Sequence, residues 1–481
     1  MNFLLTLPEI AVVAVGLGLL LLDLWTPREQ KRSLGYVAIG MLGIILAGTF
    51  FADVTAPQYA FGQMYVWDSL SLFFKRYFLV FGILVLVMGM DYADAFESGI
   101  VEYYSIGLFA LAGMMWASSA NDFSLLFVSV ELMAVSFYVL VGFERNKAYS
   151  LEAAVKYLIM GAVASAFLVY GIAFVYGSSG ALAMILPTGL SSESSTLLHI
   201  GLGCVCVALG FKIAAFPFQI WAPDVYQGSP TPTTAMLAAG SKAAGIALLL
   251  RVLFTCAPEV TRHWRVAVMA LAGLTILYGN LCAIPQKNIK RLMGYSSIAN
   301  AGYLLLGFAA FSVEGVQAVL FYLGGYLFAL MAAFTAIGVA LKKTEAEDNN
   351  GLAGLHRRSP LLAAALTLSM VSLAGVPPMA GFFGKFLLIK SVVVQGAADS
   401  RYYWLLAIAL LGVVISLYYY LNVVRAIYWG KSREENGPIE ISLPVKCSLS
   451  FSMAAMLWIG LLPNSLLLWA QDAAKALLKI N

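Results

Sequence analysis

The chain has 481 residues, of which 61% are hydrophobic and only 11% are charged, and its formal net charge is +4. Soluble domains carry about 25% charged residues, so a soluble protein of this composition could not cover its own surface. Most of the chain must therefore face lipid. The small positive charge, spread over loops, argues against a nucleic-acid partner. The five cysteines show neither the clustering of a metal site nor that of a disulfide framework.

Apolar segments long enough to cross a bilayer recur along the whole chain. A transmembrane helix needs about 20 mainly apolar residues. The N-terminal segment has no basic n-region and no convincing cleavage site, which predicts a retained first span rather than a signal peptide. Fourteen spans are expected, near 3–24, 34–52, 70–90, 102–120, 122–143, 153–176, 198–221, 234–255, 265–284, 292–311, 314–341, 360–394, 402–429 and 446–470.

Prolines interrupt two of these spans. Pro217 lies in GFKIAAFPFQIWAP, and Pro377 and Pro378 lie near the middle of a span that is too long for one straight crossing. Proline removes a backbone donor and clashes with the preceding turn, so both spans are expected to be broken helices. Each has a lysine close to its break, Lys212 in the first and Lys385 in the second.

These breaks suggest an internal repeat. The five spans of 102–255 and the five of 265–429 each have a proline-broken fourth member. Because five is odd, the second set would enter the membrane from the opposite side, as in many transporters. The prediction is an all-α polytopic membrane protein with two inverted five-helix repeats. An N-terminal three-helix segment, 1–95, precedes them, and a C-terminal helix within 446–481 follows.

The basic residues of the loops predict an orientation. An even number of spans leaves both termini on one side. Lysine and arginine are more abundant after odd-numbered spans, and the positive-inside rule makes that side cytoplasmic. The opposite side has fewer basic residues, among them Lys75 and Arg76. Both termini are therefore expected on the non-cytoplasmic side.

Five ionisable residues stand out within the spans: Glu131, Lys156, Lys212, Lys242 and Lys385. A lysine at the bilayer centre costs roughly 2.5–3.5 kcal/mol on insertion scales, so such residues are functional candidates by default. The alternative is a set of structural ion pairs that fix helix packing. Lys156 lies close to the cytoplasmic end of its span, where its side chain could also extend to the interface.

The chemistry of these groups favours proton transfer. Burial destabilises the charged form of a lysine, and a nearby carboxylate stabilises it again. A lysine whose partner can approach or retreat could therefore load and release a proton. A proline break frees backbone groups that water can satisfy. Lys212 and Pro217 together thus predict a hydrated, titratable site at membrane depth.

A polar stripe follows in NIKRLMGYSSIANAGYLLLG, where Ser296, Asn300 and Tyr303 share one helical face. A polar packing seam is the alternative reading. The chain has no Walker loop, no GxGxxG after a strand and no CxxC. We therefore expect no redox cofactor and no metal in this chain. Paired haem ligands are not expected either, because the three histidines lie at span ends or in loops: His199, His263 and His356.

Several of these segments resemble a known family. VELMAVSFYVLVGF surrounds Glu131, FKIAAFPFQIWAPDVYQGSPTPTTA begins beside Lys212, GSKAAG contains Lys242 and LAGVPPMAGFFGKF ends beside Lys385. Together with KRLMGYSSIANAGY they are similar to the antiporter-like membrane subunits of bacterial proton-pumping NADH:quinone oxidoreductase, respiratory complex I. The resemblance covers nearly the whole chain, including the number of spans.

The resemblance implies roles for the buried charges. Glu131 and Lys212 would be the coupled pair of a first half-channel, Lys242 the central relay and Lys385 the terminal group of a second half-channel.

Three further residues would be secondary relays: Lys156, Asn300 and Tyr303. Many relatives have a histidine where this chain has Asn300. Because asparagine can orient water but cannot titrate, a proton-carrying role is in doubt there.

The resemblance also implies the setting. The chain would be a proton-translocating membrane subunit in the inner membrane of a bacterial cell. Its partners would be other membrane-arm subunits, including paralogous antiporter-like ones, with lipid, protons and internal water. Flavin, iron–sulfur clusters and quinone would belong to partner subunits. Two alternatives stay open: a subunit of a cation/proton antiporter of the same fold, and a non-pumping structural subunit.

Overall fold

A computed structural model was analysed for the whole chain. It describes residues 3–52, 54, 56–96, 99–185, 192–256, 264–342, 348, 351–430 and 437–479.

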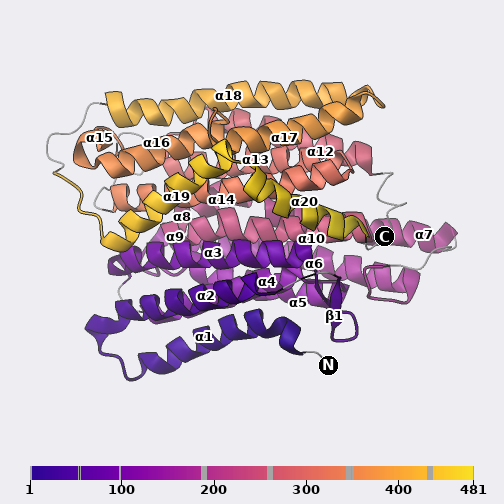
Figure 1. Cartoon of the computed structure of the whole chain (residues 1–481), viewed down its shortest axis with the longest axis horizontal. Coiled ribbons are helices and arrows are strands. Elements are labelled where there is room, and N and C mark those ends of the chain that lie inside the picture. Colours follow the sequence, from indigo (N-terminus) through magenta and orange to yellow (C-terminus); the bar gives the residue numbers. More distant parts are fainter. Residues whose placement is uncertain are drawn as a thin grey trace.

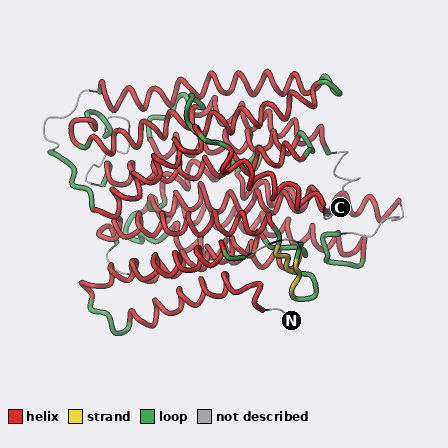
Figure 2. Tube along the Cα trace, in the orientation of Figure 1, coloured by secondary structure: helices red, strands yellow, loops and turns green. Residues whose placement is uncertain are grey.

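The described chain is a bundle of long helices that run side by side, with one small β-hairpin (Figures 1 and 2). The first part comprises η1 (Phe3–Thr6), α1 (Leu7–Asp23), η2 (Arg28–Ser33), α2 (Leu34–Phe50), β1 (Gln58–Ala60), β2 (Tyr65–Trp67), α3 (Ser69–Tyr92) and η3 (Ala93–Ala95). The strands β1 and β2 are antiparallel, with Tyr59 opposite Val66.

The central part of the chain is also helical throughout its described elements. These are α4 (Ile100–Ser118), α5 (Phe123–Val141), α6 (Ala148–Ser179), α7 (Ser192–Ile213), α8 (Trp221–Gly228), α9 (Thr231–Ala235), the π-helical η4 (Met236–Ser241), α10 (Lys242–Thr255), α12 (Arg265–Ala283), α13 (Ile289–Ala309) and α14 (Val313–Leu341). The C-terminal part comprises α15 (Leu355–Arg358), α16 (Pro360–Ala374), α17 (Ala380–Gly396), α18 (Arg401–Trp429), α19 (Leu443–Leu461) and α20 (Asn464–Lys479).

The all-α polytopic fold predicted from the sequence is confirmed. Among the described residues, 12 helices are long and apolar enough to cross a membrane. Two predicted spans are not among these 12. They correspond to α13 and to the segment divided into α16 and α17.

One predicted span differs from the structure. The segment 446–470 was expected to be a single helix, but it is divided into α19 and α20 at Leu462 and Pro463. Proline lacks a backbone N–H and disfavours the helical conformation of the residue before it, so the helix ends there. The sequence segment is apolar and of spanning length, which concealed this break.

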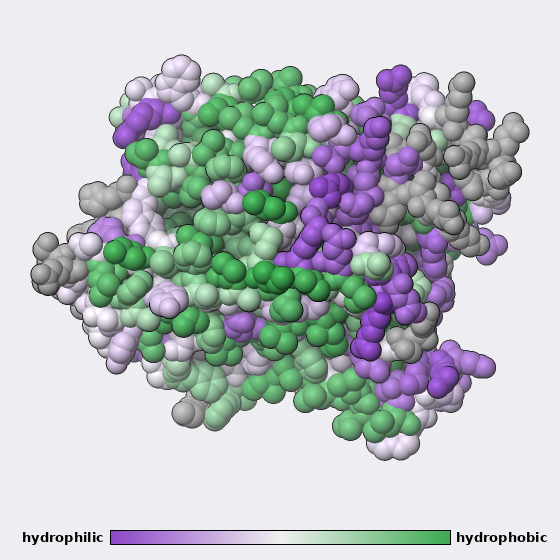
Figure 3. Space-filling model, turned by 180° about the vertical axis from the view of Figure 1, so that it is seen from behind, coloured by the Kyte–Doolittle hydropathy of each residue, from purple (hydrophilic) through white to green (hydrophobic). Residues whose placement is uncertain are grey.

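The helices differ sharply in burial. Every residue of the segment from α9 through η4 to α10 is buried, so this segment lies in the centre of the bundle. The outer helices α1, α6 and α18 instead expose large apolar side chains such as Leu21, Tyr170 and Val414. Figure 3 shows hydrophobic residues over much of one face and hydrophilic ones gathered toward the right of that view. This pattern is that of a protein surrounded by lipid.

Two buried ion pairs join the first helices to the centre. Glu9 of α1 pairs with Lys75 of α3 at 3.1 Å, and both side chains are fully buried. Asp68, the N-cap of α3, receives two hydrogen bonds from the guanidinium of Arg251 in α10, at 2.9 and 3.1 Å. Lys75, which is counted above among the basic residues of the non-cytoplasmic side, lies inside α3, within the expected span 70–90.

Removing one partner of a buried pair leaves an uncompensated charge, which typically costs about 3–5 kcal/mol. We therefore expect Asp68→Asn to lower the unfolding temperature of the purified chain clearly, measured by the loss of monodisperse protein on heating in detergent. Asparagine retains the ability to cap α3, so the change isolates the charge.

Asp399→Asn is the control, because Asp399 pairs at the surface with Arg401, the first residue of α18. Surface pairs contribute little, so this variant should unfold at the temperature of the unchanged chain. Equal unfolding temperatures for the two variants would contradict the stabilising role of the Asp68–Arg251 pair.

Candidate functional site

The first break in the bundle lies beside Lys212. This lysine is in the last turn of α7, which ends at Ile213, and Pro217 lies between α7 and α8. The final carbonyls of a helix have no partner within the helix. The indole Nε1 of Trp221 donates to one of them, the carbonyl of Phe211, at 3.0 Å. The break thus places backbone polar groups next to a lysine whose side chain is only 5% exposed.

Glu131, the expected partner of Lys212, lies in α5. The two side chains nevertheless form no ion pair within 4.0 Å in the described part of the chain. The carboxylate instead accepts a hydrogen bond from the hydroxyl of Ser165 in α6, at 2.5 Å. The two members of the expected pair are therefore not in direct contact, and the carboxylate of Glu131 is held by a neutral hydroxyl.

Lys242 begins α10, directly after the π-helical turn η4. Such turns occur frequently at functional sites, where they alter the direction of side chains. The ammonium of Lys242 donates to the backbone carbonyl of Ser297 at 2.5 Å and also to its hydroxyl. The same hydroxyl lies 3.1 Å from the hydroxyl of Tyr226 and 3.5 Å from that of Tyr326. Both of these hydrogen bonds of Lys242 thus go to neutral oxygens of Ser297.

A buried polar network continues from there to Asn300. Tyr322 stacks on Tyr326 with ring centroids 5.7 Å apart, and its hydroxyl donates to the amide oxygen of Asn300 at 2.6 Å. The amide nitrogen of Asn300 donates to the carbonyl of Ser296 at 2.9 Å and to the hydroxyl of Tyr420 at 3.3 Å. Helices α13, α14 and α18 therefore contribute to this cluster, in which Tyr322 and Tyr326 are joined by ring stacking and not by a hydrogen bond.

The second break supplies the partners of Lys385. Its ammonium, in α17, donates to the carbonyl of Leu373 at 2.7 Å and to that of Ala374 at 3.3 Å. These are the last two residues of α16, where carbonyls are free and the negative end of the helix dipole favours a cation. The ammonium also lies 4.7 Å from the ring centroid of Tyr303. The hydroxyl of Tyr303 donates to the backbone carbonyl of Ala409, at 3.1 Å.

The two breaks are not equivalent in detail. Pro377 and Pro378 lie between α16 and α17, as Pro217 lies between α7 and α8. Lys212, however, belongs to the helix before its break, whereas Lys385 belongs to the helix after its break. Along the chain, Lys212 therefore precedes its proline break, whereas Lys385 follows its own.

Lys156 does not join the buried network. Its side chain is 43% exposed and pairs with Glu152 at 2.7 Å and with Asp224 at 2.9 Å. Asp224 also accepts from the guanidinium of Arg291 at 2.5 Å. Lys156 thus belongs to a cluster of charges that connects α6, α8 and α13.

Sequence reasoning missed most of the neutral members of this site. They share a polar group on an otherwise apolar helix, which is a weak signal in a single sequence: Ser165, Tyr226, Ser297, Tyr322, Tyr326 and Tyr420.

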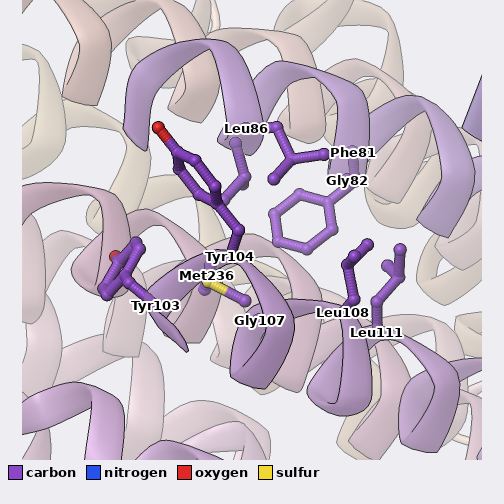
Figure 4. Close-up of a pocket in the computed structure, with 10 residues that line it drawn as sticks. Phe81, Gly82, Leu86, Tyr103, Tyr104, Gly107, Leu108, Leu111 and Met236 are labelled. Carbon is purple, nitrogen blue, oxygen red and sulfur yellow. The ribbon is translucent and has the colours of Figure 1, made fainter. Parts of the chain in front are cut away.

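A small cavity lies apart from these lysines. It is lined by apolar side chains and by Tyr103 and Tyr104 from α3, α4 and η4, with Met236 at one side (Figure 4). Its volume of about 20 Å³ has room for roughly one water molecule. Within the described ranges, no group of three or more histidine, cysteine, aspartate or glutamate residues could hold a metal. His263 lies outside the described residues.

Comparison with known proteins identifies the family. Residues 120–416 match the model of the family described as NADH:quinone oxidoreductase/Mrp antiporter, TM. The NADH-quinone oxidoreductase subunit N of Moorella thermoacetica is 40% identical over 468 residues, which are 97% of either chain. The chain belongs to this NADH:quinone oxidoreductase/Mrp antiporter family. The resemblance inferred from the sequence motifs is confirmed.

Solved structures of the family share the fold. A chain of respiratory complex I from Thermus thermophilus is 33% identical, with a TM-score of 0.80 over 96% of this chain and 98% of that one. A chain of the Mrp complex from Dietzia sp. DQ12-45-1b has a TM-score of 0.85 over 99% of this chain and 98% of that one. At 21% identity, the second likeness establishes the common fold alone.

Proposed function

We propose that the chain is the proton-translocating membrane subunit N of a bacterial NADH:quinone oxidoreductase, located in the inner membrane. The named relative that matches over 97% of the chain supports this assignment, as does the fold shared with a chain of complex I. Proton transport is the contribution of this chain, and oxidation of NADH with reduction of quinone is an activity of the whole complex.

The observation that carries the proposal is that two buried lysines, Lys242 and Lys385, donate to neutral oxygens and, in the part of the chain that the structure describes, to no carboxylate. Both lysines are at most 3% exposed, and neither has a carboxylate within 4.0 Å among the described residues. A lysine held by neutral oxygens can lose its proton without leaving an unpaired anion behind, which a buried ion pair cannot do.

The neutral members would pass protons along hydrogen bonds. A hydroxyl both donates and accepts, so Ser297, Tyr322 and Tyr420 can each exchange one hydrogen bond for another. Asn300 has no proton to give at neutral pH, but it orients the hydroxyls of Tyr322 and Tyr420. Internal water would complete the steps that side chains do not reach.

The first half of the chain would supply protons to Lys242. A carboxylate at Glu131 that approached Lys212 would stabilise the ammonium form of that lysine. A movement that separates the two groups would release the proton toward Lys242. The hydroxyl of Ser165 would hold the carboxylate while Lys212 is neutral. Lys156, in the surface cluster with Asp224, would at most collect protons near the entrance.

Electron transfer would take place in partner subunits. These would contain flavin and iron–sulfur clusters and would bind quinone. The redox energy would reach this chain through conformational or electrostatic coupling along the membrane arm. Neighbouring partners would include paralogous antiporter-like subunits.

The proposed architecture is a pair of inverted repeats, 102–255 and 265–429, flanked by 1–95 and by a C-terminal part within 446–481. The presence of a broken segment in each repeat, α7–α8 and α16–α17, supports it.

A cation/proton antiporter subunit is the second candidate, favoured by the fold shared with the Mrp complex. Co-purification discriminates between the two. Isolation of the tagged chain with flavin and iron–sulfur subunits supports the first function, and isolation with other membrane subunits alone supports the second. A purely structural subunit, the third candidate, would tolerate neutral substitutions of its buried lysines.

Lys385 provides a test that separates proton exchange from packing. Arginine retains a positive charge but stays protonated at physiological pH. We expect Lys385→Arg to reduce proton pumping in sealed vesicles by roughly 100-fold, the lower end of the range that loss of a proton-transfer group costs. Lys385→Met should reduce it similarly, because it removes the proton carrier.

Complex abundance on a native gel is the control for both variants. If the arginine variant pumped fully while the methionine variant failed to assemble, Lys385 would be a structural cation.

The orientation is proposed from the basic loops, with both termini outside the cytoplasm. The N and C labels at the same end of the helices in Figure 1 support a common side. A reporter fused at Asn481 should appear on the non-cytoplasmic side, and one inserted at Asn349 on the cytoplasmic side. Both positions lie outside the described residues. Detection of both reporters on one side of the membrane would mean that the span count between them is wrong.

A further inference from the structure

A lateral groove lies between α2, α3, α14, α19 and α20, away from the lysine network. Figure 1 shows α19 and α20 passing in front of α3 and α14. The groove has a volume of about 530 Å³, within the range of roughly 300–1,000 Å³ for small-molecule sites. Its walls are nearly all apolar, and several of their aromatic side chains are about half exposed: Phe50, Phe451, Trp458 and Trp469.

Arg76 of α3 is the one charged residue among those that line the groove. Its Nη2 donates to the carbonyl of Thr49, in the last turn of α2, at 2.8 Å. The guanidinium carbon lies 4.5 Å from the ring centroid of Phe50 and 5.2 Å from that of Trp469. The Nε atom is buried and has no hydrogen-bond partner in the protein.

This cation differs from its neighbours in its lack of an anion. Lys75, the preceding residue, is paired with Glu9, and Arg251 is paired with Asp68. Arg76 has no carboxylate within 4.0 Å in the described part of the chain. A charge in apolar surroundings is costly unless it is paired, and contact with aromatic rings compensates only in part. An anion from outside the chain would supply the missing partner.

The surroundings identify the class of this anion. Arg76 is level with the end of α2, and tryptophan side chains lie on the groove, as is usual near the membrane–water interface. A free phosphate would satisfy the guanidinium but would leave the apolar walls uncovered. A phospholipid would do both, because its phosphodiester matches the planar donors of arginine and its chains match the walls.

We propose that this groove is a binding site for one anionic phospholipid, with the phosphodiester against Arg76 and the acyl chains between α3, α14 and α19. The site is independent of the proton network, because no residue that lines it belongs to that network. The lipid would fill the lateral opening between the first helices and the C-terminal ones, and thereby link them.

Trp469 is a built-in reporter for this site. The full-length chain is reconstituted into nanodiscs that contain acyl-brominated phosphatidylglycerol in one series and acyl-brominated phosphatidylcholine in the other. The fluorescence quenched in the unchanged chain but not in Trp469→Phe measures occupancy of the groove. We expect half-maximal quenching at a fraction of phosphatidylglycerol about fivefold lower than the fraction of phosphatidylcholine that is needed. One arginine near a membrane surface provides a preference of this size for an anionic lipid. Arg76→Gln should abolish that preference, and Arg76→Lys should retain part of it.

Arg401→Gln is the matched control, because Arg401 is exposed and already paired with Asp399. It should leave the preference unchanged. Equal quenching by the two lipids in the unchanged chain would overturn the proposal even if no variant could be purified. An undiminished preference in Arg76→Gln would overturn it too. The absence of quenching by either lipid would mean that protein fills the groove, which is also incompatible with the proposal.

Discussion

A charge inside a bilayer must find compensation within the protein or at its surface, and this structure meets that constraint in two different ways. Glu9 with Lys75, and Asp68 with Arg251, are closed ion pairs between helices that are distant in sequence. Removing either member leaves the other as an uncompensated buried charge, so such pairs fix both the charge state and the position of the two side chains. Lys242 and Lys385 instead donate hydrogen bonds to neutral oxygens. Either lysine can therefore lose its proton without leaving an unpaired carboxylate.

The backbone makes this second arrangement possible. Lys385 uses carbonyls that the end of α16 leaves free, and the residues between α16 and α17 include two prolines. Lys242 follows a π-helical turn in the most deeply buried segment of the bundle, where its ammonium meets Ser297 of α13. Interrupted helices thus provide polar groups at membrane depth without introducing further charges.

The sequence predicts the outline of this fold better than its interior. Apolar length and proline positions indicate the spans and the breaks near Pro217 and Pro377, but the break at Pro463 lies in a segment that looks like an ordinary helix. Lys75 lies within the expected span 70–90, but the sequence does not indicate that Glu9 pairs with it. Lys242 of α10 donates to Ser297 of α13, whose hydroxyl also meets those of Tyr226 and Tyr326, and no local pattern indicates that these groups from separate helices lie together.

The claim that Lys242 and Lys385 exchange protons, whereas the ion-paired residues do not, is tested most directly at Lys242. Proton translocation per NADH oxidised is measured in sealed vesicles that contain the intact complex with Lys242→Met, at an abundance equal to that of the unchanged complex. Methionine has nearly the same length but cannot bind a proton. The account predicts a marked fall in proton translocation. An unchanged number of protons per NADH would contradict it, because the network could then not depend on this lysine.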